Sequence, residues 1–221
     1  MALVVFLRGV NVGGHRTFRP TTLTKQLAHL GALNIGAAGT FVIQQPVTEE
    51  RLRAELTSTL PFETEIVICQ GREIVRLMAH SHFADQRIGP DVVRFVSVLS
   101  TRPRSAPSMP INVPSSGRWL LKLLKRDKRF IFGVYRRHMK VIGYLGTLDR
   151  LFGVPITTRN WNTMTTIARV VGQGEPERTG LEDRKPELPN TRRQPTARVS
   201  SSESSKERAP RGYSRTSGSV R

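Results

Sequence analysis

The stretch Leu3-Val4-Val5-Phe6-Leu7-Arg8-Gly9-Val10-Asn11-Val12-Gly13-Gly14 decides how the chain begins to fold. Its first five residues form a continuous apolar, β-prone run, which predicts a buried strand. A loop rich in glycine and asparagine ends that strand, and Pro20 then opens a segment with apolar Leu23, Leu27 and Leu30. This spacing is typical of a helix. The chain therefore starts as strand, loop and helix.

The next elements complete a recognisable order. Gly31 ends the first helix, and the second is bounded by Pro46 and Pro61, because proline does not continue a helix. The expected elements are strands over 33–36, 40–44 and 65–70, a helix over 46–60, and a connecting helix over 71–80. The order strand, helix, strand, strand, helix, strand is that of the ferredoxin-like (split βαβ) plait.

A second unit is expected to begin at the strand 92–99. The proline-rich passage 103–114 predicts extended or looped chain, and 118–125 predicts a short amphipathic turn or helix. We expect 130–134 and 139–145 to pair as a hairpin and the last helix to start near 159–162. This unit is predicted to be a second plait, less complete than the first, and no sequence repeat relates the two.

After residue 171 the composition shifts to Gly, Pro, Ser, Thr, Glu and Arg. Such a segment buries too little apolar surface to offset its chain entropy, so we expect it to be disordered. The predicted fold class is therefore α+β, with two tandem ferredoxin-like plait domains and a disordered basic C-terminal tail. The expected boundaries are 1–85, 90–171 and 172–221.

The chain is strongly basic, with 35 Lys and Arg against 17 Asp and Glu and a net charge of +18. Residues 1–171 hold 24 of the basic and 10 of the acidic side chains, so most of the excess lies in the ordered part. An excess of this size favours an anionic partner, and counterion release strengthens binding when that partner is a nucleic acid. Solubility alone is the competing interpretation.

The single cysteine, Cys69, cannot form an internal disulfide and lies in an apolar run, which fits a reducing cytoplasm. The apolar stretch 2–7 is too short for the core of a signal peptide. No window approaches 18 consecutive apolar residues, so neither a membrane span nor a membrane partner is expected. The predicted location is the cytoplasm.

Two motifs carry a resemblance to a known family. The opening Leu7–Gly14 loop and the string Thr157-Thr158-Arg159-Asn160-Trp161-Asn162-Thr163-Met164 resemble motifs of the domain-of-unknown-function 1697 family of bacterial proteins. The similarity spans residues 2–171, and it implies two tandem plait-like domains with no known substrate, cofactor or catalytic residue. Family members carry an aromatic and Ser-Gly-Asn run before the third strand, where this chain has Ala37-Ala38-Gly39-Thr40-Phe41. We therefore expect no polar site contribution from that turn.

The opening loop is the first candidate binding site. Its residues lie between a strand and a helix, where backbone N–H groups and flanking cations can hold an anion. The glycine spacing is neither that of a phosphate-binding P-loop nor that of a dinucleotide-binding fingerprint. The candidate anion-binding residues are Arg8, Asn11, Gly13 and Gly14. A purely structural loop, with glycines at positive φ and Asn11 satisfying the backbone, is the alternative.

The second motif supplies further candidates, Arg159, Asn160 and Asn162. A hydroxyl or amide here can cap the last helix, with Trp161 as a buried anchor between the domains. Capping needs only one such side chain, however, and a guanidinium matches phosphate or carboxylate geometry. We therefore predict that Arg8, Asn11, Arg159 and Asn160 approach one another in a cleft between the domains.

A basic, aromatic-rich segment predicts contact with nucleic acid. Cations follow a phosphate backbone and exposed aromatic rings stack on bases, and Trp119, Phe132 and Tyr135 are interleaved with the cations here. A solvated basic face is the alternative interpretation. The candidate nucleic-acid-binding residues are Lys122, Lys125, Arg126, Arg129, Arg136 and Arg137.

The sequence as a whole predicts a binding module for an anionic ligand, with nucleic acid favoured. The alternative is an enzyme that acts on a phosphorylated or carboxylated small molecule in the interdomain cleft, with Arg8 and Arg159 as electrostatic clamps. A protein-interaction role is a third interpretation. No catalytic group, cofactor or metal site emerges from the pattern, and the sequence leaves the oligomeric state open.

Overall fold

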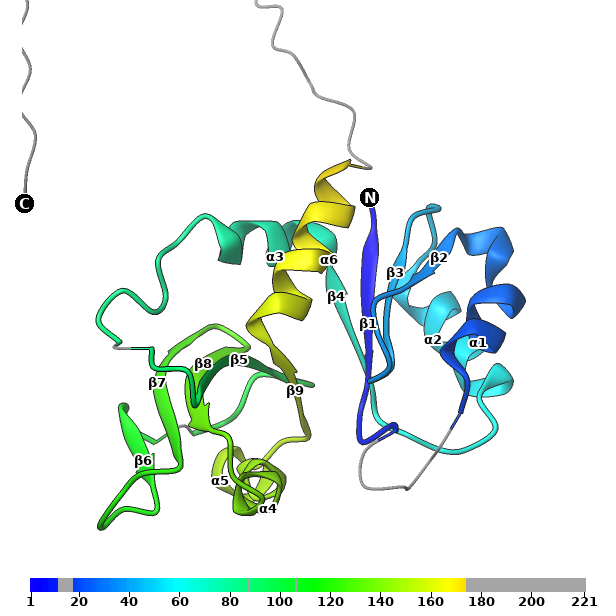
Figure 1. Cartoon of the computed structure of the whole chain (residues 1–221). Coiled ribbons are helices and arrows are strands. Elements are labelled where there is room, and N and C mark those ends of the chain that lie inside the picture. Colours follow the sequence, from blue (N-terminus) through cyan, green and yellow to red (C-terminus); the bar gives the residue numbers. More distant parts are fainter. Residues whose placement is uncertain (12–17, 87, 106, 174–221) are drawn as a thin grey trace, which may run out of the picture. The chain divides into compact units, whose positions relative to one another are not determined.

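Two antiparallel sheets, one from each half of the chain, organise the fold (Figure 1). The structure is a computed structural model, and it describes residues 1–11, 18–86, 88–105 and 107–173. Helices and strands are both abundant, and neither sheet contains a parallel pair. The α+β class predicted from the sequence is confirmed.

Sheet 1 has four strands in the order β2-β3-β1-β4, and every neighbouring pair is antiparallel. Its strands are β1 (Leu3–Leu7), β2 (Ala32–Asn34), β3 (Thr40–Ile43) and β4 (Ile66–Gln70). Its helices are α1 (Pro20–Gln26), a 3₁₀ turn (Ala28–Leu30), α2 (Glu49–Thr59) and α3 (Gly71–Met78). All elements predicted for this half are present, within a few residues of the expected bounds.

Local sequence explains why these elements form where they do. All of β1 is buried, because both faces of the sheet are covered, which accounts for a continuous apolar run rather than an alternating one. The Thr48 hydroxyl accepts a hydrogen bond from the Arg51 amide and caps α2. Glu73 accepts from the Gln70 amide at the start of α3. Each of these capping contacts joins residues within four positions of each other, so the local sequence predicts well where the helices begin.

Sheet 2 has five strands in the order β6-β7-β8-β5-β9, again antiparallel. Its strands are β5 (Val92–Leu99), β6 (Ile111–Val113), β7 (Leu121–Asp127), β8 (Phe130–Arg136) and β9 (Ile156–Asn160). Its helices are α4 (Lys140–Gly146), α5 (Leu148–Phe152) and α6 (Trp161–Gln173).

Two predictions for this half are wrong. Residues 118–125 form no helix, because Leu121 and Leu123 alternate into the core as part of strand β7. Residues 139–145 do not pair with β8; they form α4, and β8 pairs instead with β7 and β5. The expected hairpin therefore lies one element earlier, at the turn Lys128–Arg129.

The two halves share a strand order. Sheet 1 reads β2-β3-β1-β4, and the part β7-β8-β5-β9 of sheet 2 repeats it position for position. In both halves a helix follows the last strand directly, α3 after β4 and α6 after β9. The halves differ in their first connection, which contains α1 in the first half and β6, with no helix among its described residues, in the second.

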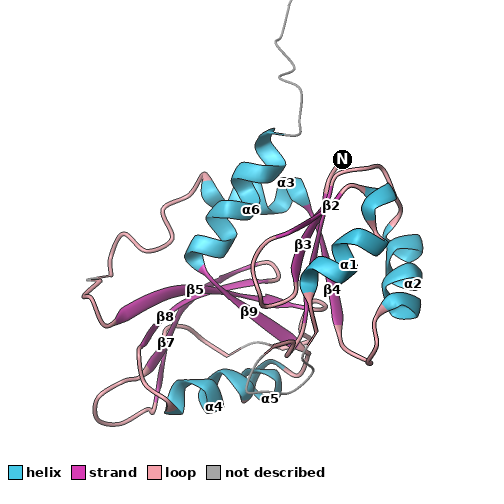
Figure 2. Ribbon diagram, turned by 45° about the vertical axis from the view of Figure 1, so that its right-hand side comes forward, coloured by secondary structure: helices cyan, strands magenta, loops and turns pink. Residues whose placement is uncertain are grey.

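Helices α3 and α6 lie between the two sheets, and the remaining helices cover the outer faces (Figure 2). The central core combines residues from both sheets and both of these helices, including Phe6, Cys69, Phe132 and Ile167. A second core lies between sheet 1 and α1 and α2, and a third lies between sheet 2 and α4 and α5. The halves therefore share their central core.

This shared core bears on the domain boundaries. Residues up to Gln173 lie in one compact unit, and the division into domains at 1–85 and 90–171 stays a prediction. Helix α6 extends to Gln173, so its last two residues fall within the expected tail, 172–221. Residues 174–221, which carry the rest of the predicted tail, lie outside the described residues.

Candidate functional site

The buried arginine of the second motif is a structural latch. Arg159 lies on β9 and is 6% exposed. Its guanidinium donates across to sheet 1, to the Thr40 hydroxyl at 2.6 Å, the Leu7 carbonyl at 2.9 Å and the Ala38 carbonyl at 2.8 Å. It also donates to the Thr157 hydroxyl at 2.8 Å. The donor fork is therefore satisfied by neutral oxygens inside the protein.

Burial has an electrostatic consequence for this side chain. Desolvation lowers the pKa of Arg159 from 12.5 to about 10, so the group remains charged at neutral pH. The ring of Phe6 lies 5.5 Å below the guanidinium and adds a cation–π contact. No carboxylate pairs with this charge among the described residues. The side chain is fully engaged and holds the halves together.

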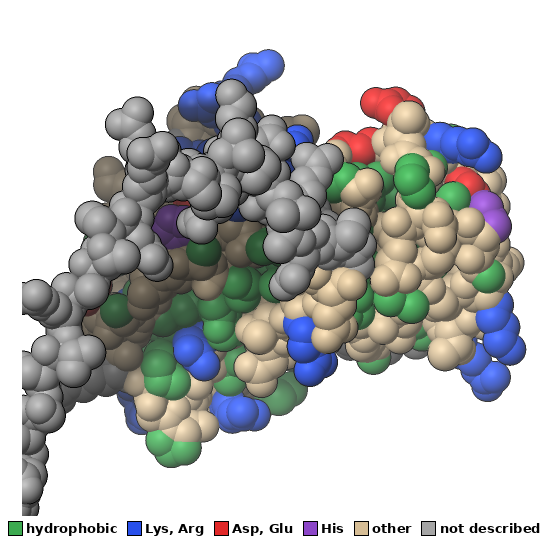
Figure 3. Space-filling view, turned by 90° about the horizontal axis from the view of Figure 1, so that it is seen from above, with side chains coloured by type: hydrophobic (Ala, Val, Ile, Leu, Met, Phe, Trp, Pro, Cys, Tyr) green, Lys and Arg blue, Asp and Glu red, His purple; other side chains and the backbone are tan. Residues whose placement is uncertain are grey.

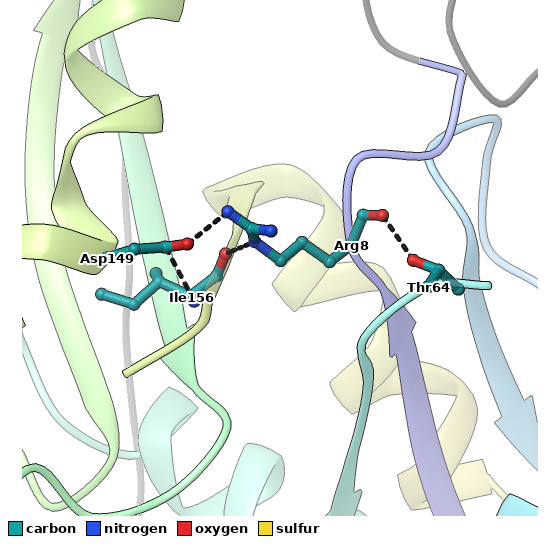
Figure 4. A network of polar contacts seen from close by, with 4 residues as sticks. All are labelled: Arg8, Thr64, Asp149 and Ile156. Atoms are coloured by element: carbon teal, nitrogen blue, oxygen red, sulfur yellow. Dashed lines mark hydrogen bonds and ion pairs between the residues drawn. The ribbon is translucent and has the colours of Figure 1, made fainter. Parts of the chain in front are cut away.

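Arg8 makes the second link between the halves (Figure 4). Its guanidinium forms an ion pair with Asp149 of α5, and its Nε donates to the Ile156 carbonyl at 3.2 Å. Asp149 also accepts from the Ile156 amide at 3.0 Å. On the other side, the Thr64 hydroxyl donates to the Arg8 carbonyl at 2.7 Å. Arg8 therefore joins β1 to the start of β9.

Arg129, at the turn between β7 and β8, makes the third link. It donates to the carbonyls of Leu99, Ser100 and Ile68, each at 3.1 Å. Ile68 belongs to sheet 1, so this guanidinium also crosses between the sheets. We call Arg8, Arg129 and Arg159 the arginine latches. Sequence analysis placed all three in binding sites, and all three have intramolecular partners.

Asn11 has a structural role in the opening loop. Its backbone has φ 55°, in the left-handed region that asparagine tolerates. Its amide donates to the Ala37 carbonyl at 2.7 Å and the Phe18 carbonyl at 3.1 Å, and its oxygen accepts from the Phe18 amide at 3.0 Å. The loop is thus tied to the turn before β3. Gly13 and Gly14 lie outside the described residues.

Asn160 and Asn162 differ from each other. The Asn160 oxygen accepts from the Thr163 amide at 2.7 Å and its hydroxyl at 2.9 Å, which caps the start of α6. The Asn162 side chain is exposed and has no hydrogen bond among the described contacts. Both line a hollow of about 320 Å³ beside Trp161, at the end of sheet 2 where β5 begins.

The predicted convergence is therefore seen only in part. Arg8 and Arg159 both reach across the seam between β1 and β9, and Asn11 bonds to the same turn, 37–39, that Arg159 contacts. Each of these three has protein partners. Asn160 points to the separate hollow instead. The candidate residues therefore form two groups. Arg8, Asn11 and Arg159 bond to the protein at the seam between the halves, whereas Asn160 and Asn162 are exposed at the separate hollow.

Charge is concentrated in the second half of the chain. Residues 90–171 carry 15 Lys and Arg against three Asp and Glu, whereas residues 1–85 carry eight against seven. On the face drawn in Figure 3, the Asp and Glu side chains lie mostly toward the end that carries α1 and α2. Any anion attracted by the net charge is therefore drawn to sheet 2 and its connections.

A basic surface lies at the end of sheet 2 where β5 finishes and β7 turns into β8. Two hollows of about 570 and 510 Å³ open there, and they share Thr101 and Arg102. Among the described residues, Glu73 is the only acidic one that lines either of them. We call their unlatched cations the basic track, and its members are Arg102, Arg104, Arg126, Lys128 and Arg150.

These cations are free to meet a ligand. All five are exposed, and none pairs with a carboxylate among the described residues. Only Arg126 was a candidate from the sequence. Arg102, Arg104 and Arg150 come from the β5–β6 connection and α5, which are remote in sequence from the basic segment. The topology alone brings them together, so no local signal could have identified them.

The other predicted nucleic-acid-binding residues are dispersed. Lys122 and Arg136 flank the Trp119 ring, at 5.1 and 4.4 Å from its centroid, and Arg136 pairs with Asp91. Lys125 is exposed on β7, and Arg137 is exposed beside the smaller hollow. The six candidates therefore do not form one surface.

The described residues hold no cluster of three or more His, Cys, Asp or Glu that could bind a metal. None of the helices in these ranges is both long and apolar enough to cross a membrane. Cys69 is buried, and desolvation raises its thiol pKa from 9.0 to about 12. It is therefore an inert core residue and no nucleophile.

Comparisons with known proteins identify a family and a similar fold. The model of a family described as "Protein of unknown function (DUF1697)" matches residues 1–118. No curated protein matches the sequence. Among solved structures, the conserved bacterial protein SP0830 from Streptococcus pneumoniae is similar in fold, with a TM-score of 0.50 and 14% identity. The match covers 77% of this chain and 98% of that one.

Proposed function

Because this chain belongs to the DUF1697 family of proteins of unknown function, its activity has to be inferred from its own residues, and we propose that it is a binding module for single-stranded nucleic acid. The observation that carries the proposal is the basic track. Five exposed cations line two adjacent hollows, and Glu73 is the one carboxylate among the described residues that line them. Such an arrangement attracts a polyanion.

The shape of the track favours a strand over a small molecule. The two hollows share Thr101 and Arg102 in their linings, so cations from the β7–β8 turn, the β5–β6 connection and α5 lie along adjacent hollows. Phosphates along a strand are spaced to meet cations in a line, whereas a small metabolite needs a single enclosed pocket. Hydroxyls of Ser100, Thr101 and Ser105 lie among these cations and can donate to phosphate oxygens.

The alternative, an enzyme acting on a small anion between the domains, receives less support. It needs Arg8 and Arg159 as free electrostatic clamps. Arg8 is paired with Asp149, and Arg159 donates to carbonyl and hydroxyl oxygens. Releasing Arg159 from its partners would cost stability, since a buried donor without a partner is unfavourable. Releasing Arg8 would break its ion pair with Asp149.

We further infer that both halves are ferredoxin-like plaits and that the protein acts in the cytoplasm. The shared order β2-β3-β1-β4 and β7-β8-β5-β9 supports the first inference, since a plait has this order with every pair antiparallel. In the second plait the first helix is replaced by the connection that contains β6. The lone buried Cys69, which takes part in no disulfide, supports the second.

The proposal is tested by fluorescence anisotropy with a labelled, mixed-sequence single-stranded RNA of 12 nucleotides. A triple variant, Arg102→Gln with Arg126→Gln and Lys128→Asn, removes three charges from the track. Asparagine is chosen at 128 because the backbone there has φ 52°. We expect this variant to bind much more weakly and to lower the slope of log K against log salt by about 2.

The matched control removes three exposed cations from the first half, Lys25→Gln with Arg51→Gln and Arg76→Gln. This control lowers the net charge by the same amount as the track variant. It should therefore lose the same RNA affinity only if binding depends on the overall charge of the protein. Equal losses in the two triple variants, or no affinity of the unmodified protein near physiological salt, would overturn the proposal.

A further inference from the structure

The smaller hollow at the opposite end of sheet 2 has a different chemistry from the basic track. Three aliphatic residues between 88 and 93 form part of its wall. We call it the amide hollow, and its polar and aromatic lining consists of Arg94, Tyr135, Arg137, Asn160, Trp161 and Asn162. It therefore combines cations, amides and aromatic rings in a volume of about 320 Å³.

The hollow is cationic and has no acidic member among its described lining residues. Asp91, close by in sequence, is engaged by Arg136 and by Arg118 at 3.7 Å. Arg94 and Arg137 are both exposed and form no ion pair among the described residues. Two guanidinium groups without a counter-ion favour a ligand with a phosphate or carboxylate group.

The amides provide a second type of recognition. Capping of α6 uses the Asn160 oxygen, which leaves its NH₂ group without a partner among the described contacts. Asn162 takes no part in the cap; the Thr166 hydroxyl donates to its backbone carbonyl at 3.0 Å, and its side-chain amide has no hydrogen bond among the described residues. Its whole side-chain amide is thus available. Side-chain amides pair with the edges of nucleobases, which present donors and acceptors side by side.

The aromatic wall is held rigidly. Trp161 packs edge-on against Phe83, with centroids 5.0 Å apart, and Phe83 in turn contacts Phe132 at 6.1 Å. The Arg94 guanidinium lies 5.8 Å above the Phe83 ring, and Arg94 and Trp161 both line the hollow. A planar ligand can pack against such a wall without disturbing the core.

Tyr135 completes the set. Burial raises the pKa of its phenol, and the charge of Arg137 opposes that rise. The hydroxyl therefore keeps its proton at neutral pH and can donate a hydrogen bond. Tyr135 and Arg137 both line the hollow, which therefore carries a phenol donor as well as cations.

We propose that the amide hollow binds a mononucleotide, with the phosphate held by Arg94 and Arg137 and the base held by Trp161, Asn160 and Asn162. Inorganic phosphate alone would leave the amides and the aromatic wall unused. The volume lies at the lower end of the range of about 300–1,000 Å³ for small-molecule sites, which suits one nucleotide. This site is separate from the basic track and does not depend on it.

The test uses the full chain with Trp119→Phe, which leaves Trp161 as the only tryptophan of the two in the sequence. The protein is titrated separately with AMP, GMP, CMP, UMP and inorganic phosphate, with Trp161 emission excited near 300 nm to avoid absorption by the bases. Calorimetry on the unmodified chain provides an independent affinity. We expect at least one mononucleotide to quench Trp161 and to bind at least tenfold more tightly than phosphate.

Two variants test the contacts. Asn162→Ala and Arg137→Ala should each weaken that mononucleotide about tenfold, since each removes a hydrogen-bonding group from the ligand. Asn34→Ala and Arg51→Ala are the matched controls, because both side chains are exposed in the first half of the chain. Equal effects of Asn162→Ala and Asn34→Ala would overturn the proposal, as would mononucleotides that bind no better than phosphate.

The outcome is independent of RNA binding at the track. The triple variant at Arg102, Arg126 and Lys128 should keep its full affinity for the mononucleotide. A loss of mononucleotide affinity in that variant would assign the binding to the track and refute a separate site. RNA binding by the track can fail while the amide hollow still binds its ligand.

Discussion

At the scale of single residues, the fold depends on guanidinium groups that reach between the sheets. Arg159 is the most deeply buried of the three latches, and its partners are carbonyls and hydroxyls rather than carboxylates. Capping alone does not explain Arg159 in the sequence, and in the structure its guanidinium donates across to sheet 1. The sequence predicts a ligand contact for Arg159 because it does not show that β9 lies against the end of β1.

We predict that Arg159→Lys destabilises the protein by about 3 kcal/mol. Lysine keeps the charge but cannot reproduce the planar fork, so the Leu7 and Ala38 carbonyls lose their donor. Urea denaturation followed by circular dichroism measures the change. Arg169→Lys on the exposed face of α6 is the control, and equal urea midpoints for the two variants would refute the role of the latch.

At the scale of elements, prediction succeeded where local signals were complete. Strand β1 and helix α2 were predicted from an apolar run and from capping and proline signals. Prediction failed for β7 because Leu, Lys and Arg favour helices, and the alternation of Leu121 and Leu123 is interrupted by a bulge near Leu124. It failed for α4 because Val141 and Ile142 favour strands, although the chain there has to cross the outer face of sheet 2.

Strand β8 offers a sharp test of sheet packing. A Cβ atom added at Gly133 would overlap the Phe95 ring and lie 2.6 Å from the Lys122 carbonyl. We predict that Gly133→Ala costs about 2 kcal/mol, because the ring cannot move without displacing its neighbours in the core. Thermal or urea unfolding measures this cost.

The control is Gly143→Ala in helix α4, where an added Cβ would meet nothing within 4 Å. Alanine favours the helix over glycine, so this change should stabilise the protein by up to about 1 kcal/mol. The two substitutions therefore differ in sign. If both had the same small effect, the packing of Phe95 against β8 would not be a constraint on the fold.

At the scale of the whole molecule, two halves with the same strand order are joined by a common core. That core includes the inner faces of both sheets, with α3 and α6 between them. The sequence predicted the α+β class, which the two separate antiparallel sheets confirm, but it did not show how the two halves pack against each other. The continuous apolar run of β1 indicates that both of its faces are buried, but it does not show which elements cover each face.

The shared core leads to a prediction about folding. We expect the full chain to unfold in a single thermal transition and the fragment 1–85 to show no cooperative transition of its own, because it lacks the cover that α6 and sheet 2 provide for Phe6 and Cys69. Circular dichroism follows both, and binding of an apolar dye to the fragment reports its exposed face. Two transitions in the full chain would mean that the halves fold separately.

The neutral partners of Arg159 have a practical implication. Dissolved ions weaken contacts between exposed charges far more than they weaken a buried donor bonded to carbonyl groups. The protein should therefore tolerate washing in concentrated sodium chloride, which strips bound polyanions from it during purification, and still elute in its native form.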